Sequence, residues 1–277
     1  MSDRDLKLDS KVLNPQRFSD NADLYDKVRP QCPQKAVDML SGYLGREPEC
    51  VVDLGCGTGL STLAWYDRCS RIIGVEPSGG MRKQAQEKVV ACGMTDRVRF
   101  IEGYSDATGL ETASADIITC SQSFHWMDPQ KTLEEVNRLL IKGGIFAAYD
   151  CDFPPSCHWE AELCYEKLLS KVRELEQEHP RIKESFRRWD KDRHLESIKN
   201  SGYFRYAREL VFSSQEQCTA KRFIGIALSQ GGLQQALKEE VEGFRPLVDS
   251  FAQSIESLFG DKTFTIDFGY RMRIGVK

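Results

Sequence analysis

The sequence predicts an α/β protein built on a doubly wound, mostly parallel β-sheet, and three observations support this. Short apolar runs alternate with helical patterns over residues 34–149. A loop with glycines at positions 55, 57 and 59 lies between the first apolar run and a helical pattern. Two further β-like segments occur late in the chain. Strand–helix alternation at this spacing is typical of parallel strands joined by right-handed crossovers.

The expected elements of the first half are short apolar runs bounded by turn residues, which indicate strands, and apolar residues at helical spacing, which indicate helices. We expect strands at residues 50–54, 71–76, 98–102, 115–120 and 145–149, and helices at residues 34–44, 60–66, 81–92 and 132–141. Gly45 can end the first helix, and Gly143-Gly144 can turn the chain before the fifth strand.

The character of the chain changes after Asp150. Pro154-Pro155 interrupts the pattern, and the segments that follow are helical at 160–178, β-like at 207–212, helical at 215–259 and β-like at 264–276. We expect the late strands to complete a seven-stranded sheet with an antiparallel edge and the inserted helices to form a cap. Residues 1–150 would be a cofactor-binding core with an N-terminal lid, and residues 151–277 the cap with the late strands, all in a single structural unit.

Composition restricts the kinds of partner. The 277 residues are 40% hydrophobic and 29% charged, which is ordinary for a globular protein. No run of 18 or more apolar residues occurs, and the charged start Met1–Lys7 lacks the apolar region of a secretory signal. The net charge of −4 disfavours nucleic acid as a partner. We therefore expect a cytoplasmic protein, without membrane contact, that acts on a small molecule as a monomer or homodimer.

Ten cysteines are scattered along the chain without any Cys-x-x-Cys pair. Redox and zinc motifs use such pairs, and a chain of this length does not need disulfides for stability. We expect reduced, mostly buried thiols and no metal. Cys56 in the glycine loop is the alternative, a catalytic nucleophile, but its neighbours supply no histidine or other base.

The glycine loop indicates a nucleotide-type cofactor at the carboxyl end of a parallel strand. Gly55 and Gly57 let the backbone turn tightly and approach a ligand closely. A dinucleotide fingerprint needs a third small residue where this chain has Leu60, and no Gly-Lys-Ser/Thr of a P-loop occurs. Glu76 follows the second strand, 23 residues after Asp53, where a carboxylate can accept hydrogen bonds from a ribose. A helix N-terminal carboxylate is the alternative role for Glu76.

These residues resemble a known family. The segment 51–59, Val-Val-Asp-Leu-Gly-Cys-Gly-Thr-Gly, together with Val75-Glu76-Pro77-Ser78, resembles the class I S-adenosylmethionine-dependent methyltransferases, which have a Rossmann-like fold. Two further segments resemble the type 11, small-molecule branch that includes trans-aconitate methyltransferases. They are Tyr25-x-x-x-Arg29-Pro30 and 121–126, Ser-Gln-Ser-Phe-His-Trp. The resemblance is loose from residue 80 to 150 and weak beyond.

The resemblance implies a set of cofactor-binding residues. They are Tyr25, Arg29, Asp53, Gly55, Cys56, Gly57, Thr58, Gly59, Glu76, Pro77, Ser105, Asp106, Ser121 and Gln122. Asp53 would lie near the cofactor's amino group, Glu76 would hold the ribose, and Ser105 and Asp106 would contact adenine. Tyr25 and Arg29 would close over the cofactor.

The resemblance also implies an enzyme that uses S-adenosylmethionine, releases S-adenosylhomocysteine and needs no metal. His125 and Trp126 would line the substrate pocket, with His125 a candidate base. A carboxylate acceptor would need no base and is expected first, whereas a hydroxylated or amine metabolite is the alternative. A non-catalytic regulatory protein that binds the cofactor stays open, and an NAD-dependent enzyme is disfavoured by Leu60. The basic segment 181–193 is either a solvated helical face or a site for an acidic small molecule.

Overall fold

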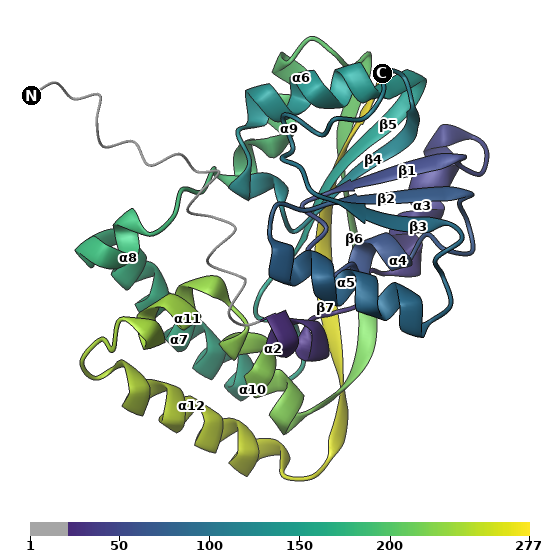
Figure 1. Cartoon of the computed structure of the whole chain (residues 1–277). Coiled ribbons are helices and arrows are strands. Elements are labelled where there is room, and N and C mark those ends of the chain that lie inside the picture. Colours follow the sequence, from purple (N-terminus) through teal and green to yellow (C-terminus); the bar gives the residue numbers. More distant parts are fainter. Residues whose placement is uncertain (1–21) are drawn as a thin grey trace, which may run out of the picture. The chain divides into compact units, whose positions relative to one another are not determined.

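The computed structural model describes residues 22–277, and its sheet has seven strands in the order β3-β2-β1-β4-β5-β7-β6 (Figure 1). The strands are β1 Cys50–Leu54, β2 Arg71–Val75, β3 Val98–Ile101, β4 Ala115–Ser121, β5 Leu140–Cys151, β6 Tyr206–Thr219 and β7 Thr263–Val276. Strands β1 to β5 are parallel, and β7 is antiparallel to β5. The predicted fold class, a mostly parallel seven-stranded sheet with a late antiparallel strand, is confirmed.

The helices follow the predicted alternation. They are α2 Ala22–Val28, α3 Gln34–Leu44, α4 Leu60–Leu63, α5 Gly79–Ala91, α6 Pro129–Leu139, α7 Trp159–Glu178, α8 Pro180–Glu184, α9 His194–Asn200, α10 Ala220–Leu228, α11 Gly231–Lys238 and α12 Phe244–Phe259, with two 3₁₀ turns, η1 Phe124–Trp126 and η2 Lys191–Arg193. Side chains cap several of these, for example Ser78 on α5 and Asp128 on α6.

Several predicted boundaries were wrong, and three of them have a clear physical reason. The helix after the glycine loop ends at Leu63 rather than residue 66, because the next amides bond three residues back, as Trp65 does to Thr62. The fifth strand begins at Leu140, before the predicted Gly143-Gly144 turn, and the shift of register beside β4 accommodates the extra residues. Residues 215–219 continue β6, because alternate residues there are exposed, as on a strand.

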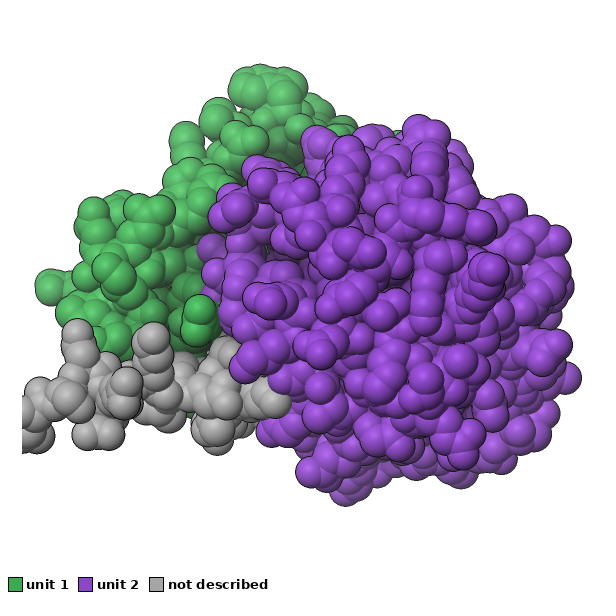
Figure 2. All heavy atoms as spheres, turned by 90° about the horizontal axis from the view of Figure 1, so that it is seen from above, with its two compact units in different colours: residues 1–30, 152–187, 213–269 green, residues 31–151, 188–212, 270–277 purple. Residues whose placement is uncertain are grey.

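The chain divides into two compact units, coloured separately in Figure 2. Unit 1 comprises Met1–Pro30, Asp152–Arg187 and Ser213–Gly269, and unit 2 comprises Gln31–Cys151, Arg188–Phe212 and Tyr270–Lys277. Strands β6 and β7 each have residues in both units. The first 21 residues, among them the charged start Met1–Lys7, lie outside the described part of the chain. The expected division of the chain at residue 150 stays a prediction.

Unit 2 contains the sheet core. Alternate residues of β1 point to opposite faces, so Cys50, Val52 and Leu54 pack in a buried cluster with α6 and α9. Asp53, between them, points to the other face, toward α4. The cluster is made of fully buried side chains of the central strands and of the two helices, including Leu133, Val136, Phe146 and Ile198.

Unit 1 has its own core of aromatic side chains. Tyr165 on α7 lies edge-on to Phe223 and Phe251, with ring centroids 5.6 and 5.7 Å away. Edge-to-face pairs at this separation are favourable beyond their buried area. The sequence allowed two interpretations of residues 223–233, a flexible cap over the substrate or a part of the core. In the structure, Phe223, Ile226 and Leu233 of this segment have no exposed surface. None of the helices within residues 22–277 is long and apolar enough to span a bilayer.

Candidate functional site

The glycine loop connects β1 to α4 and is fastened to β2. The amides of Gly55 and Cys56 both donate to the carbonyl of Val75, at 2.8 and 3.2 Å. Gly55, Gly57 and Gly59 all have positive φ, a conformation that glycine adopts without steric cost.

The three glycines differ in what a Cβ would meet. At Gly55 it would collide with Met127 and Ser123, and at Gly59 with the ring of Phe100. At Gly57 no described atom lies within 4 Å of the Cβ position. Gly55 and Gly59 therefore serve the packing of the protein itself, whereas Gly57 borders open space where a ligand can approach the backbone.

Asp53, near the end of β1, connects the start of the glycine loop to neighbouring elements through hydrogen bonds. Its carboxylate has no exposed surface and accepts hydrogen bonds from the hydroxyls of Ser61 (2.6 Å), Thr62 (2.7 Å) and Thr119 (2.8 Å). Burial raises the pKa of Asp53, while these hydroxyls act in the opposite direction. The carboxylate thus ties β1 to α4 and β4, and the direct contact with a cofactor amino group that the resemblance implies stays a prediction.

Glu76 follows β2 and is oriented by backbone amides. Oε1 accepts the amide of Ser78 at 2.9 Å, and Oε2 accepts the amide of Gly57 at 3.0 Å. The residue is 8% exposed, and burial raises the pKa of its carboxyl while the two amide bonds lower it. A carboxylate oxygen accepts more than one hydrogen bond, so Glu76 can still receive a ligand hydroxyl beside Gly57.

The other predicted cofactor residues of unit 2 lie at the carboxyl ends of the strands. Ser105 and Asp106 form a tight turn closed by a bond from the Ala107 amide to the Tyr104 carbonyl, and the Ser105 hydroxyl pairs with that of Thr132 at 2.8 Å. Cys56 and Thr58 are buried in the glycine loop, and Pro77 follows Glu76. Ser121 is the last residue of β4, and Gln122 after it has a positive φ of 56°.

Tyr25 and Arg29 belong to unit 1. The Arg29 guanidinium lies 4.7 Å from the ring centroid of Tyr25 and 5.0 Å from that of Phe153, and it donates to the carbonyl of Ser229 at 3.2 Å. Arg29 is 8% exposed. The guanidinium of Arg29 is therefore packed against two aromatic rings rather than exposed at the surface. Closure over a cofactor stays a prediction for both residues.

His125 is held next to the glycine loop. It lies in η1, four residues after the end of β4, and the Ser123 hydroxyl donates to the carbonyl of Leu54 at the end of β1, at 2.7 Å. Strand order reverses between β1 and β4, and the crevice at such a reversal is where α/β proteins bind ligands. Trp126 follows, with its ring centroid 4.8 Å from that of His125.

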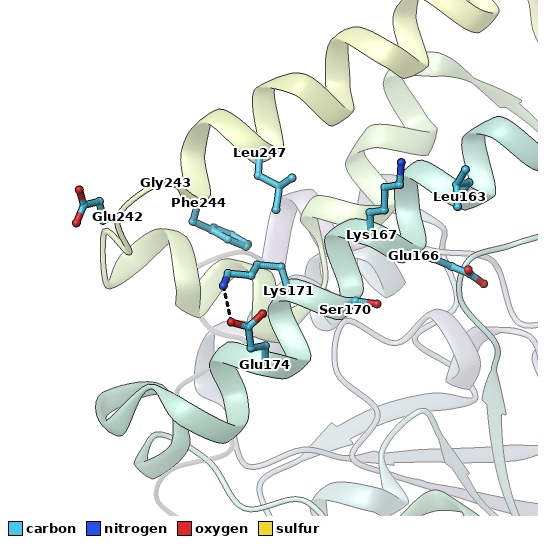
Figure 3. Close-up of a pocket in the computed structure, with 10 residues that line it drawn as sticks. All are labelled: Leu163, Glu166, Lys167, Ser170, Lys171, Glu174, Glu242, Gly243, Phe244 and Leu247. Carbon is cyan, nitrogen blue, oxygen red and sulfur yellow. Dashed lines mark hydrogen bonds and ion pairs between the residues drawn. The ribbon is translucent and has the colours of Figure 1, made fainter.

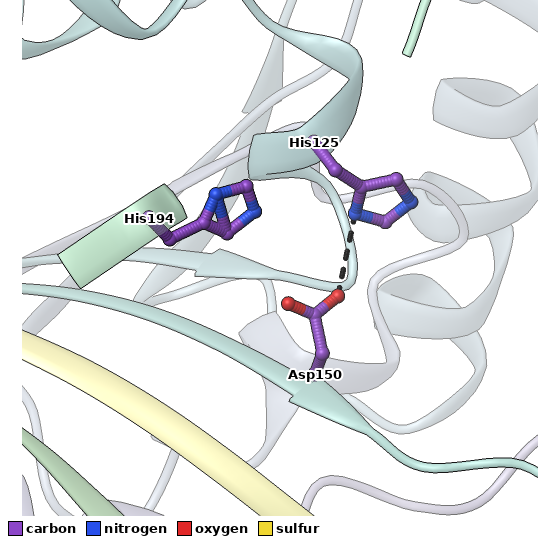
Figure 4. Close-up of side chains that lie close together, drawn as sticks. All are labelled: His125, Asp150 and His194. Atoms are coloured by element: carbon purple, nitrogen blue, oxygen red, sulfur yellow. Dashed lines mark ion pairs between the residues drawn. The ribbon is translucent and has the colours of Figure 1, made fainter. Parts of the chain in front are cut away.

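A polar cluster includes the buried residues His125, Asp150, His194 and Arg273 together with the partly exposed Lys191 and Glu209, and we call it the His125 cluster. Nδ1 of His125 lies 3.3 Å from Oδ1 of Asp150 (Figure 4). Lys191 Nζ lies 2.8 Å from the same oxygen, and Arg273 lies 3.6 Å from Oδ2. Arg273 also pairs with Glu209 at 2.7 Å.

The cluster shifts the protonation of its members. Burial lowers the pKa of His125 to about 4, with the positive charge of Lys191 acting in the same direction. Burial likewise lowers the pKa of His194 to about 4. For Asp150, burial acts to raise the pKa, but Lys191 and His125 outweigh it, and the pKa lies below its usual value. Both imidazoles are therefore neutral and Asp150 is ionised at neutral pH.

His125, Asp150 and His194 also offer three ligand atoms within 4.8 Å of one another. Two histidines and a carboxylate can hold a divalent cation. Here, however, Lys191 and Arg273 already neutralise the carboxylate, and a cation among these atoms would lie beside the Lys191 ammonium. The charges therefore do not favour a metal at this cluster.

Sequence reasoning missed most of the cluster. Asp150 directly follows the predicted strand 145–149 and lies near the carboxyl end of β5, beside β4, which was a usable signal. Lys191 and His194 come from a later segment whose pairing no local pattern reveals. The amide of Trp189 donates to the carbonyl of His125 at 2.8 Å, so the helical face predicted for residues 181–193 is interrupted between α8 and η2, although most of its charged residues are exposed.

Unit 1 has an open groove of about 700 Å³ between α7 and α12 (Figure 3). Its walls carry charges of both signs, among them Lys171 and Glu174, which pair with each other at 2.6 Å.

Six of the ten cysteines are buried, which confirms the expectation of mostly buried thiols, whereas their reduced state stays a prediction. Burial raises the pKa of Cys56 well above its usual value, which disfavours a nucleophilic thiolate there.

The known proteins that this chain resembles, in sequence or in structure, are described as methyltransferases. Residues 52–148 match the family model described as "Methyltransferase domain". A Saccharomyces cerevisiae protein named as the probable S-adenosylmethionine-dependent methyltransferase CRG1 is 27% identical over 124 residues, 44% of this chain and 43% of that protein. The malonyl-[acyl-carrier protein] O-methyltransferase of Nitrosospira multiformis is 27% identical over 147 residues, 47% of this chain and 48% of that protein.

These sequence matches span about half the length of the curated relatives. A solved structure from Anaeromyxobacter dehalogenans, described as a candidate type II methyltransferase, superposes with a TM-score of 0.67 at 18% identity. It covers 90% of this chain and 97% of that one. At this identity the superposition shows a common fold.

Proposed function

We propose that this chain is a class I S-adenosylmethionine-dependent methyltransferase that transfers the methyl group of S-adenosylmethionine to a small-molecule acceptor and releases S-adenosylhomocysteine. One observation carries the proposal. The Glu76 carboxylate is oriented by the amide of Gly57, beside a backbone position that borders open space. That arrangement suits a ribose lying across the loop.

The residues present fit the cofactor. Glu76 offers acceptor oxygens to the two ribose hydroxyls. The ribose ring has room beside Gly57 because this residue has no side chain. We propose that Gly55, Gly57 and Gly59 form the floor of the site, and that the turn Ser105-Asp106 contacts adenine. At Gly57 the proposed contact is made by the backbone, since no side chain separates it from the open space.

S-adenosylmethionine, when bound, supplies a methyl group on a positively charged sulfonium that is a good leaving group. The protein's part is then to bind, to exclude water and to align the acceptor with that methyl. Positioning of this kind contributes up to about 7–11 kcal/mol to lowering a barrier. The Ser123 hydroxyl bonds to the Leu54 carbonyl, and the missing side chain of Gly55 leaves room for Ser123 and Met127, so η1 lies against the loop. We propose that an acceptor approaches beside His125 and Trp126.

The acceptor is proposed at the level of a small molecule. The sequence favoured a carboxylate, with a hydroxylated or amine metabolite as the alternative, and the trans-aconitate-like branch stays a prediction. One relative over half the chain is named as an O-methyltransferase, which supports an oxygen acceptor. We also propose that no nucleic acid or metal takes part and that the protein acts as a monomer or homodimer.

Two measurements test this function. Calorimetry should show binding of S-adenosylmethionine and S-adenosylhomocysteine, with no binding of NAD. Methyl-labelled S-adenosylmethionine incubated with the protein and a small-metabolite extract should yield a labelled product. Binding without transfer to any fraction would favour a regulatory protein, and failure to bind S-adenosylmethionine would refute the proposal.

A further inference from the structure

The two ring nitrogens of His125 have different surroundings. Nδ1 faces the carboxylate of Asp150, with Oδ1 3.3 Å away as an ion-pair contact, and it makes no hydrogen bond to any group of the described chain. Figure 4 shows that Nε2 points away from Asp150. In a neutral imidazole one nitrogen carries the proton and the other carries a lone pair.

Asp150 decides which nitrogen carries the proton. It is 4% exposed, and Lys191 and Arg273 keep it ionised by ion pairs at 2.8 and 3.6 Å. An ionised carboxylate can only accept hydrogen bonds, so the proton of His125 is stabilised on Nδ1. A proton on Nε2 would leave the lone pair of Nδ1 against a negative oxygen in a buried site, which is costly.

His125 also stays neutral rather than becoming an imidazolium. Within the cluster, the charges of Lys191 and Arg273 balance those of Asp150 and Glu209. The remaining neighbour, His194, is neutral and 1% exposed, and Arg188 adds positive charge nearby. A proton added to His125 would be an unbalanced buried charge.

We infer that the methyl acceptor presents a hydrogen-bond donor, a hydroxyl or an amine N–H, to the lone pair of Nε2 of His125. This inference rests on the proposed function and narrows its acceptor. A carboxylate acceptor would place its oxygens against that lone pair and would be repelled. Asp150 is then a positioning residue, and Lys191 keeps it ionised.

The proton balance follows from this orientation. The acceptor oxygen or nitrogen forms a bond to the methyl carbon as the carbon–sulfur bond breaks, and the electron pair of that bond stays on sulfur. The acceptor's O–H or N–H bond breaks, and its proton passes to Nε2. The acceptor becomes more acidic as its bond to carbon forms, so even a weakly basic imidazole can take the proton. His125 then returns the proton to solvent.

The tautomer can be measured without any acceptor. Two-bond ¹H–¹⁵N correlation spectra of the protein labelled with ¹⁵N-histidine distinguish the Nδ1–H and Nε2–H forms of each of the four histidines. The spectrum of His125→Gln identifies the signal of His125. We expect the Nδ1–H form at pH 7, and an Nε2–H or imidazolium form would overturn the inference.

Asp150→Asn separates the acceptor classes. The amide can donate to Nδ1 and so move the proton to Nε2, with little change in shape. With a hydroxyl or amine acceptor, kcat should fall at least about 100-fold while the Kd for S-adenosylmethionine stays within about twofold. With a carboxylate acceptor, the new Nε2–H donor would preserve or raise kcat, which would overturn the inference.

The base stability of the methylated product tests the inference with the wild-type protein alone. Label transferred from S-adenosylmethionine should survive mild base as an ether or amine, whereas base-labile methyl ester would overturn the inference. Failure to bind S-adenosylmethionine by calorimetry would instead refute the proposed function. The tautomer measurement would still decide the orientation of His125 in that case, and it does not depend on whether Asp150→Asn folds.

Discussion

The glycine loop and the His125 cluster lie on neighbouring strands of one sheet but are assembled in different ways. The loop and Glu76 come from residues 53–78, and backbone amides make their main contacts. The cluster draws side chains from five separate stretches between residues 125 and 273. A ligand that many proteins share can be bound by a short local motif, whereas the acceptor side depends on long-range packing.

The two regions also respond to acid in opposite directions. Burial raises the pKa values of Asp53 and Glu76, so protonating these carboxyls favours the folded state. In the His125 cluster, burial lowers the pKa values of both histidines, so acid favours the unfolded chain. Because the two regions have different proposed roles, substitutions in the glycine loop or at Glu76 should change cofactor binding, whereas substitutions in the His125 cluster should change acceptor chemistry.

The largest effect on cofactor binding is expected from Glu76→Ala. It removes the two proposed charge-assisted hydrogen bonds to the ribose, each worth about 1.5–3 kcal/mol, so the Kd for S-adenosylmethionine should rise at least about 100-fold. Calorimetry measures the change, and Glu87→Ala, on the exposed face of α5, is the control. His125→Gln should leave the Kd nearly unchanged, and a Kd raised equally by both substitutions would erase the distinction between the regions.

Gly57→Ala should weaken cofactor binding about 10-fold, because its Cβ enters the open space beside the loop. Gly93→Ala is a matched control, since Gly93 also has a positive φ and no atom within 4 Å of its Cβ position. Each substitution should cost about 1 kcal/mol of stability from the backbone alone. Equal cofactor affinity in the two variants would show that Gly57 does not border the cofactor.

The pH dependence of stability should show the effect of the buried histidines. The folded pKa of His194 is about 4 and that of an unfolded histidine is about 6.5, so the unfolded chain binds more protons between these values. The stability is complete above about pH 6.5 and falls as the pH drops toward 4. When the pH is lowered from 7.5 to 5, the Tm measured by thermal unfolding should fall less for His194→Gln than for the wild type. His158→Gln, outside the cluster, should behave as the wild type, and parallel curves for all three proteins would argue against a buried neutral His194.

The smallest effect is expected from Lys191→Met. Removing this positive charge should raise the pKa of His125, while Arg273 still keeps Asp150 ionised. An NMR titration of the His125 ring measures the midpoint, with Lys199→Met on the exposed side of α9 as the control. An unchanged midpoint would mean that Lys191 does not contact Asp150 in solution.

Sequence alone determined the fold class, the strands from Cys50 to Ser121 and the glycine loop, because these depend on local patterns of apolar residues and on backbone conformations that only glycine adopts freely. It also placed Glu76 and His125 at strand ends, where ligands bind in α/β proteins.

Only the tertiary structure brought Asp150, Lys191, His194 and Arg273 around His125. These side chains are separated by up to 148 positions in the chain, and no periodicity links them. The protonation of His125 depends on the burial and the charges of all of them together, so the chemistry of the acceptor side is decided by packing rather than by any local motif.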